Sequence, residues 1–462
     1  MSILSLTFLG LSAASSVFIW LFPNHSRRYT VLLCNIAFLY FLRANLLDII
    51  YVVALSLYTW IAGKVLFQLR NKKWILAFVL LPVIGLCYFK YAGYLFPNQR
   101  ILMPLGLSFY TFKAISYLAD IAKEQIESKT IVSVFDYVIF FPTFMAGPIH
   151  RGESFFEELD APFTFQYRDQ KNGFMQACLG LFQKFVFADQ LNYYVKLVLD
   201  NPALSGWYTV LGMVLYAFQL YVHFDAYSNV AIGIARMMGF HLERNFHSPY
   251  LGVSLRDFWR RWHISLSSWL RDYIYIPLGG SKKGILIKWI NIIIIFLVSG
   301  IWHGSTLMFL IWGIGHGVVM VIEDMIRKGT GGVRSWMKWF APLGILINFI
   351  IVMILWVFFR SSSMEVALHT LNVIPTLHLK DVFSVSYETI GMTLNEWYWM
   401  WIIIGITIVM DLLRYFFDMI DVLSKQFFLL RWLFYIVLII VAIIFGMYGP
   451  GYHPSDFIYV TF

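Results

Sequence analysis

Residues 286–326 read LIKWINIIIIFLVSGIWHGSTLMFLIWGIGHGVVMVIEDMI and hold two apolar runs separated by a short HGST segment. Each run is long enough to form a helix across the hydrocarbon core of a membrane, which takes about 20 mainly apolar residues. Runs of the same kind recur from one end of the chain to the other. The sequence therefore predicts an all-α, polytopic integral membrane protein.

The composition supports this class. Of the 462 residues, 60% are hydrophobic and 13% are charged, whereas soluble globular chains average about 25% charged residues. Disordered, coiled-coil, collagen-like and disulfide-scaffold classes are excluded by the same composition. The net charge of +9 indicates basic loops on the cytoplasmic side and no nucleic-acid partner. The three cysteines lie in apolar stretches without CxxC spacing, so neither a disulfide framework nor a thiolate metal site is expected.

The apolar runs predict about eleven membrane crossings within a single transmembrane domain that covers residues 1–462. A shorter apolar piece near 134–147 is expected to be re-entrant or partly buried. The first run has no basic segment before it, so it is expected to be a retained helix and not a cleaved signal peptide. Basic residues in alternate loops place the N-terminus outside the cytoplasm. The expected spans are 3–22, 29–42, 47–68, 74–92, 173–199, 207–238, 286–302, 305–326, 338–359, 397–418 and 429–448.

One region departs from the apolar pattern. Residues 254–288 mix charged side chains, including Arg256, Arg260, Arg261, Arg271 and Asp272, with five tryptophans and tyrosines. This mixture is typical of a helix that lies at the membrane interface or dips into it. An ordinary interfacial loop with lysine anchors is equally compatible with it.

His303 lies between two apolar spans, with Gly300 and Gly304 on either side. Glycine leaves room for a substrate close to the backbone, and Trp302 could form one wall of a site. A neutral imidazole there could accept a proton from a hydroxyl group near neutral pH. A buried histidine that only hydrogen-bonds a neighbouring helix is an equal alternative.

The other histidines give weaker indications of a catalytic role. His263, beside Arg260 and Arg261, could sit in a site that binds phosphate or carboxylate, or could hold the segment together. His316 is expected to pack in the bundle. His223 and Asp225 could bind a cation but are expected to stabilise the bundle. Solvated loop positions are expected for His25, His150, His369, His378 and His453, and packing roles for His241 and His247.

Several catalytic motifs are missing from the sequence. It contains no Gly-x-Ser-x-Gly elbow, so a hydrolase-type serine nucleophile is not indicated. P-loop and HExxH patterns are also missing, which argues against nucleotide-driven transport and zincin proteolysis.

Longer segments resemble the membrane-bound O-acyltransferases (MBOAT), in particular the bacterial branch that O-acetylates alginate and peptidoglycan. Residues 258–280, FWRRWHISLSSWLRDYIYIPLGG, are similar to the longest signature of that branch, and residues 302–304, WHG, to the catalytic histidine motif. Residues 104–112, 146–149, 356–360 and 457–459 resemble further family segments. One departure stands at 223–229, HFDAYSN, where branch members usually read DFSGYSD, and it leaves any role of Asp225 or Asn229 open.

The resemblance implies an enzyme, an O-acyltransferase, whose helices form a ring around a central funnel or tunnel. It implies that His303 activates the accepting hydroxyl and that His263 orients substrate or shares proton transfer, with the catalytic region at about 254–317. Trp302, Arg260, Arg271 and Asp272 are the expected substrate-binding residues.

The resemblance also implies that no metal or cofactor is bound and that acetyl-CoA or another acyl thioester is the donor substrate. The acyl group would pass across the bacterial inner, cytoplasmic membrane to an extracytoplasmic, serine esterase-like partner protein, which then acetylates a polysaccharide. One alternative is D-alanyl transfer for teichoic-acid modification, although residues 275–280, YIPLGG, fit the polysaccharide branch better. A transporter or flippase of an envelope precursor is the non-enzyme alternative, but the paired broken helices common in transporters are not visible.

Overall fold

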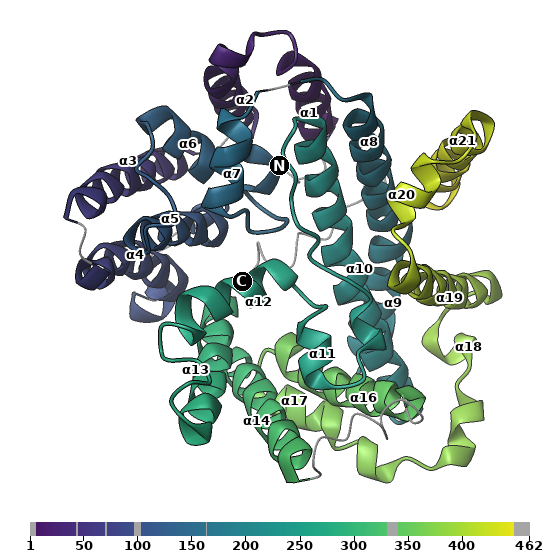
Figure 1. Ribbon diagram of the computed structural model, residues 1–462. Coiled ribbons are helices and arrows are strands. Elements are labelled where there is room, and N and C mark those ends of the chain that lie inside the picture. Colours follow the sequence, from purple (N-terminus) through teal and green to yellow (C-terminus); the bar gives the residue numbers. More distant parts are fainter. Residues whose placement is uncertain are drawn as a thin grey trace. The chain divides into compact units, whose positions relative to one another are not determined.

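The computed structural model describes residues 6–42, 45–69, 72–96, 103–162, 164–329 and 341–447. Helices make up its regular structure, and these ranges contain no β-strand, so the all-α prediction is confirmed. The chain forms two compact units (Figure 1). The first comprises the described parts of Met1–Leu181 and Tyr227–Arg244, and the second comprises Phe182–Ala226 and the described part of Asn245–Ser455. That one transmembrane domain covers the whole chain remains a prediction.

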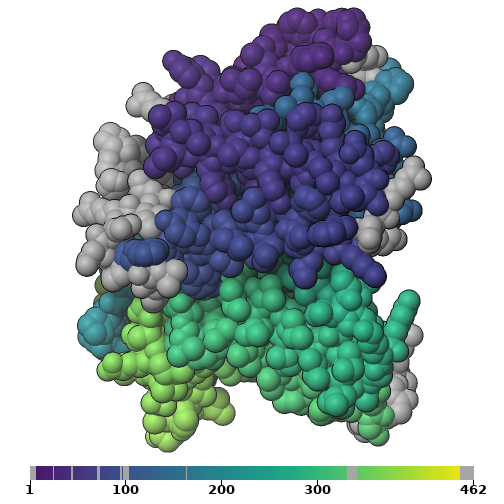
Figure 2. All heavy atoms as spheres, turned by 90° about the vertical axis from the view of Figure 1, so that its left-hand side faces the viewer, coloured from purple at the N-terminus to yellow at the C-terminus, as the bar shows by residue number. Residues whose placement is uncertain are grey.

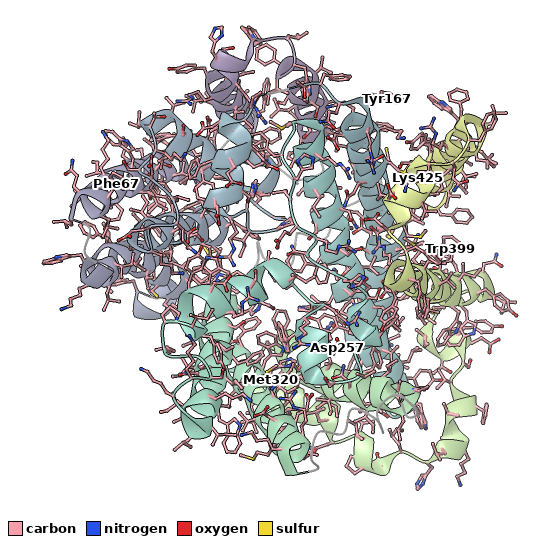
Figure 3. All side chains as sticks on the ribbon, in the orientation of Figure 1. Phe67, Tyr167, Asp257, Met320, Trp399 and Lys425 are labelled. Carbon is pink, nitrogen blue, oxygen red and sulfur yellow. The ribbon has the colours of Figure 1, made fainter. Side chains whose placement is uncertain are left out.

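The first unit is built from eight helices and the last part of a ninth within its described residues. Apolar side chains of α3 and α4, such as Leu46, Ile61 and Leu80, are exposed, as is Phe67, which is labelled in Figure 3. These two helices form part of the surface seen in Figure 2. The helices are α1 (Leu6–Phe18), α2 (Arg27–Phe41), α3 (Leu46–Leu69), α4 (Ile75–Leu95), α5 (Leu107–Ala122), α6 (Ile131–Ile139), α7 (Gly152–Asp160), α8 (Tyr167–Phe182) and α10 (Trp207–Met237), which begins in the second unit.

The second unit contains the charged and aromatic block and the histidine motif. Its helices are the π-helical turn η4 (Gln183–Ala188), α9 (Asp189–Leu199), the first part of α10, α11 (Leu255–Trp259), α12 (Ile264–Leu270), the π-helical turn η6 (Arg271–Tyr275), α13 (Ile285–His303), α14 (Leu307–Gly329), α16 (Ala341–Arg360), α17 (Met364–Leu371), α18 (Tyr387–Ile390), α19 (Leu394–Phe416), α20 (Met419–Ser424) and α21 (Phe428–Phe445).

Seven helices among the described residues are long and apolar enough to cross a membrane: α3, α4, α13, α14, α16, α19 and α21. Four further predicted spans do not meet the same criterion. The spans at 3–22 and 29–42 correspond to the shorter helices α1 and α2, and the span at 173–199 is interrupted by η4. The helix α10 has 31 residues but carries polar side chains such as His223 and Asp225. The predicted count of eleven is therefore not confirmed.

Both irregular segments that the sequence predicted are broken into short helices. Near 134–147, α6 ends at Ile139 and a 3-10 turn covers Phe141–Thr143. In the charged block, α11, α12 and η6 follow one another within 21 residues, between Leu255 and Tyr275. The Ser254 side chain accepts a hydrogen bond from the Asp257 N–H (3.2 Å), which is the usual way to start a helix.

The helices α13 and α14 approach each other closely through glycines. A Cβ atom on Gly300 would lie 2.5 Å from the carbonyl oxygen of Phe309, and one on Gly313 would lie 2.3 Å from that of Phe296. A Cβ atom on Gly304 would lie 2.3 Å from the Phe309 ring. The space beside Gly300 and Gly304 is thus filled by Phe309. These glycines serve helix packing and do not leave the room for substrate that the sequence suggested.

One end of this helix pair is strongly basic. The side chain of Asp324 in α14 is fully buried and binds Arg256 (2.8 Å), Lys288 (2.5 Å), Arg327 (3.0 Å) and the indole N–H of Trp289 (2.9 Å). A buried carboxylate needs such partners, because an unpaired charge in the interior is costly. These bonds tie the end of α14 to the start of α13 and to α11, at the end of α13 opposite to His303.

Candidate active site

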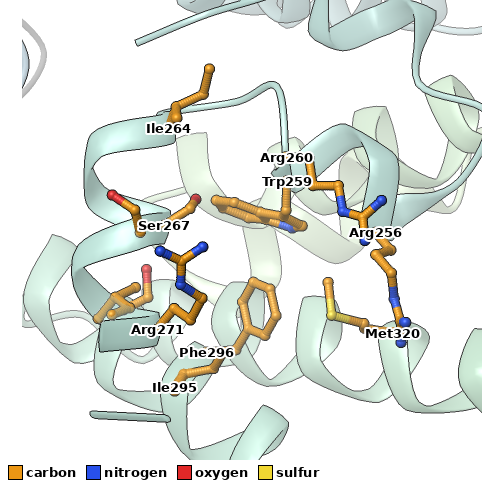
Figure 4. A pocket seen from close by; sticks show the side chains of 12 residues that line it. Arg256, Trp259, Arg260, Ile264, Ser267, Arg271, Ile295, Phe296 and Met320 are labelled. Atoms are coloured by element: carbon orange, nitrogen blue, oxygen red, sulfur yellow. The ribbon is translucent and has the colours of Figure 1, made fainter. Parts of the chain in front are cut away.

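The second unit contains a pocket of about 390 Å³ between α11, α12, η6, α13 and α14 (Figure 4). Trp259 and Phe296 lie toward the middle of the view, with the Arg271 guanidinium on one side and those of Arg256 and Arg260 on the other. The lining combines three cations with apolar surface and hydroxyl groups, which suits a ligand with both anionic and apolar parts. The complete lining is Arg256, Trp259, Arg260, Ile264, Ser267, Ser268, Leu270, Arg271, Ile295, Phe296, Ser299 and Met320.

The three arginines differ in how they are held. Arg256 is bound to Asp324 (2.8 Å), and Arg271 forms a two-pronged pair with Asp272 (2.7 and 3.2 Å). The exposed guanidinium of Arg260 makes no ion pair with any residue that the structure describes. Arg260 is therefore the cation best placed to bind a phosphate or carboxylate from outside the chain.

Ser299 connects the pocket to the histidine motif. Its hydroxyl group is buried, lines the pocket and has no hydrogen-bond partner among the described residues. It lies four residues before His303 on α13, so both side chains lie on one face of the helix. Helical side chains also lean toward the preceding turn, which brings the imidazole toward Ser299. His303 thus lies one helical turn beyond the pocket lining.

His303 is enclosed by aromatic rings. Its ring centre is 4.8 Å from that of Trp312, 5.1 Å from that of Phe359 and 4.5 Å from that of Trp302. Only 3% of its surface is exposed. A histidine in such surroundings is shielded from bulk water, and a general base acts in its neutral form.

His263 has a strained backbone. Its φ and ψ angles are 43° and 54°, in the left-handed region that residues other than glycine rarely adopt. The turn is held by Asn245, which accepts hydrogen bonds from the backbone N–H of Ile264 (2.9 Å) and from the hydroxyl of Ser265 (2.6 Å). Strain of this kind persists only where the surroundings fix it, and it is common at functional sites.

The structure brings three of the predicted site residues together and separates them from the others. The Trp302 ring lies near both histidines, with its centre 6.4 Å from that of His263 and 4.5 Å from that of His303. Arg260 and Arg271 line the pocket, and Asp272 contributes through its pair with Arg271. The histidines and Trp302 are not among the lining residues.

Some sequence-based expectations are wrong or incomplete. His150 is buried, not solvated, and His453 lies outside the described residues. Asp225 forms an ion pair with Arg414 (2.5 Å) and accepts a hydrogen bond from Gln183 (3.0 Å), which agrees with the expected bundle-stabilising role. Arg256, Trp259 and Ser299 were not singled out from the sequence. The helical spacing between Ser299 and His303 could have identified the serine.

The sequence of the chain matches a known protein family. The sequence model of the membrane-bound O-acyltransferase family matches residues 32–368. The chain belongs to this family. The predicted family membership is thereby confirmed. Of the two alternatives, an enzyme and a transporter, it supports the enzyme, an O-acyltransferase.

Relatives within the family differ in the acyl group that their names specify. The chain is 34% identical over 363 residues to the probable alginate O-acetylase AlgI of Pseudomonas fluorescens, covering 76% of this chain and 71% of that protein. It is 31% identical over 344 residues to the peptidoglycan O-acetyltransferase of Helicobacter pylori (65% and 64%). It is 27% identical over 273 residues to the teichoic acid D-alanyltransferase of Bacillus subtilis (55% and 67%). This MBOAT protein is therefore a multi-pass membrane enzyme of O-acyl transfer.

Proposed function

We propose that this MBOAT protein transfers an acetyl group from a cytoplasmic thioester donor to a hydroxyl acceptor on the outer side of a bacterial cytoplasmic membrane. The observation that carries the proposal is the position of Ser299. It lines a pocket bordered by arginines and shares a helix face with His303. A donor in the pocket would then point its acyl end toward the imidazole.

We infer the direction of transfer from the charges around α13, and this orientation departs from the eleven alternating spans expected from the sequence, a count that is not confirmed. Lys288, Arg327 and Arg256 meet at Asp324 near the start of α13, and positive residues gather on the cytoplasmic side. His303 lies 15 residues after Lys288, which is about 22 Å along a helix axis. The donor would thus enter between α11 and α14 and react near the other side of the membrane, through the tunnel that the resemblance implies.

The proposed reaction needs only a base and a positioned thioester. His303 takes the proton of the acceptor hydroxyl as the oxygen attacks the carbonyl carbon of the thioester. The new C–O bond forms, the C–S bond breaks, and the proton passes from His303 to the leaving sulfur. His263 orients the reactants or shares this proton transfer, and Trp302, whose ring lies near both imidazoles, excludes water.

The donor is proposed to be acetyl-CoA. Arg260 and Arg271 would bind its phosphates, with Asp272 orienting Arg271, and Trp259 would pack against its apolar part. Acetyl is preferred to D-alanyl because two of the three relatives named above are acetyl-transferring enzymes with the higher identities. The acceptor is proposed to be an extracytoplasmic, serine esterase-like partner protein that acetylates a polysaccharide.

Inside-out membrane vesicles from cells that produce this protein test the proposal, because they expose the cytoplasmic face to an added donor. Radiolabelled acetyl-CoA should yield alkali-labile label in the vesicle lumen, and vesicles from a deletion strain should yield none. Arg260→Gln should weaken the use of acetyl-CoA, whereas Lys425→Gln, at an exposed ion pair with Asp421 elsewhere in the chain, should not. Label from a D-alanyl carrier protein but none from acetyl-CoA would replace the acetyl proposal with the D-alanyl alternative.

A further inference from the structure

His316 is a fully buried histidine that neither the resemblance nor the proposed reaction uses. It lies in α14, and its Nδ1 atom accepts a hydrogen bond from the indole N–H of Trp259 at 3.2 Å. Trp259 lines the pocket and belongs to α11. The contact therefore joins a transmembrane helix to one wall of the candidate donor site.

The hydrogen bond fixes the protonation of the His316 ring. An indole nitrogen can only donate, so Nδ1 of His316 must carry a lone pair. The ring is then the neutral tautomer with its proton on Nε2. The two rings meet edge to face, with centres 5.1 Å apart and an angle of 83° between their planes. This contact links the orientations of the two rings, and both also pack against Phe296 and Trp312.

The packing continues from His316 to His303. The ring centres of His316 and Trp312 are 5.0 Å apart at an angle of 72°, and those of Trp312 and His303 are 4.8 Å apart at 88°. Trp312 is fully buried between the two histidines. His316 consequently touches both the pocket wall and the ring that packs against the proposed base.

We propose that His316 is a positioning residue that holds Trp259 as the wall on which the acyl donor packs. This inference rests on the proposed function, because it takes the pocket to be the donor site. A leucine at position 316 would fill a similar volume but would leave the indole N–H without its acceptor. The indole would then lose the hydrogen bond that orients it among the rings packed against it, and the pocket would change shape at that wall. Asparagine would keep an acceptor near the position of Nδ1.

The test measures acetyl transfer in vesicles as a function of acetyl-CoA concentration, together with the amount of each variant in the membrane. His316→Leu should raise KM for acetyl-CoA about tenfold and change kcat less than about threefold, since a binding wall acts on ground state and transition state alike. His316→Asn should stay within about threefold of wild type in KM. Trp259→Phe should raise KM by the same factor as His316→Leu. The double variant should have a KM close to that of either single variant, because both changes remove the same hydrogen bond.

The outcomes separate this inference from the proposed function. If wild-type vesicles transfer acetyl groups and both His316→Leu and Trp259→Phe keep the wild-type KM, the positioning role is refuted while the proposed function stands. If His316→Leu fails to accumulate, the other two variants provide the test. An unchanged KM for acetyl-CoA in Trp259→Phe refutes the positioning role. A KM in His316→Asn that is raised as much as in Trp259→Phe refutes it as well. If wild-type vesicles transfer nothing from acetyl-CoA, the proposed function fails and the inference fails with it.

Discussion

Ser299 and His303 lie one turn apart on the same face of α13, and the hydroxyl of Ser299 forms part of the pocket lining. This relationship predicts that bulk at position 299 blocks the way from the donor pocket to the imidazole. Ser299→Leu should abolish acetyl transfer in vesicles while the protein remains in the membrane. Val298→Leu, which places the same leucine side chain at the neighbouring position, should retain most of the activity. Normal transfer by Ser299→Leu would show that the donor does not pass this residue.

The buried carboxylate of Asp324 predicts a large effect on stability. Asp324→Asn leaves Arg256, Lys288 and Arg327 without their counter-ion, and breaking a buried ion pair costs about 3–5 kcal/mol. The variant should unfold at a clearly lower temperature in detergent. Asp160→Asn, at a partly exposed pair with Arg28 and Lys129, should change the unfolding temperature little. Equal effects of the two substitutions would contradict the assigned role of Asp324.

The left-handed backbone of His263 predicts that glycine at this position is more stable than alanine, the reverse of the usual order. Glycine adopts this conformation freely, whereas alanine retains a strain of about 1–2 kcal/mol. His263→Gly should therefore unfold at a higher temperature than His263→Ala, against the usual loss of stability at glycine. Acetyl transfer should be reduced in both, since neither has an imidazole. A lower unfolding temperature for His263→Gly would mean that the backbone at 263 is not left-handed.

His241, outside the membrane-spanning helices, predicts a pH-dependent contribution to stability. Its Nδ1 atom lies 3.0 Å from Glu158, and this hydrogen bond, aided by Asp169 and opposed by Arg236 and partial burial, raises the pKa of His241. A raised pKa in the folded state stabilises the protein below the unfolded value of about 6.5, and the effect is lost as the pH rises through the folded pKa.

The measurement compares wild type with His241→Gln. The difference in unfolding temperature should be larger at pH 6 than at pH 9. A difference that stays constant over this range would show that the protonated ring contributes nothing.

The sequence predicted the fold class because long apolar runs are typical of membrane-spanning helices. The positions of α13, α14, α16, α19 and α21 agree with the predicted spans within a few residues. The count of eleven was not confirmed, because hydropathy does not reveal where a run breaks, as at η4, or ends early, as at α1.

The sequence predicted several residues of the candidate site but not how they are arranged in space. The motif around His303 identified the imidazole, and the charged block identified Arg260 and Arg271. The sequence did not reveal that Phe309 fills the space beside Gly300 and Gly304, because this depends on how α13 and α14 cross. The contact between Trp259 and His316 joins residues 57 positions apart, so no local pattern could indicate it.

The most direct test of the central claim is the O-acetyl content of the extracytoplasmic polysaccharide in cells that carry His303→Ala. A general base contributes about 10²–10⁴-fold to the rate of such a reaction. The O-acetyl content should therefore fall to that of the deletion strain, with the variant present in the membrane at the wild-type amount. His369→Ala, at an exposed histidine of α17, should keep the wild-type content. Wild-type acetylation by His303→Ala, in cells whose deletion counterpart has lost it, would contradict the assignment of His303 as the base.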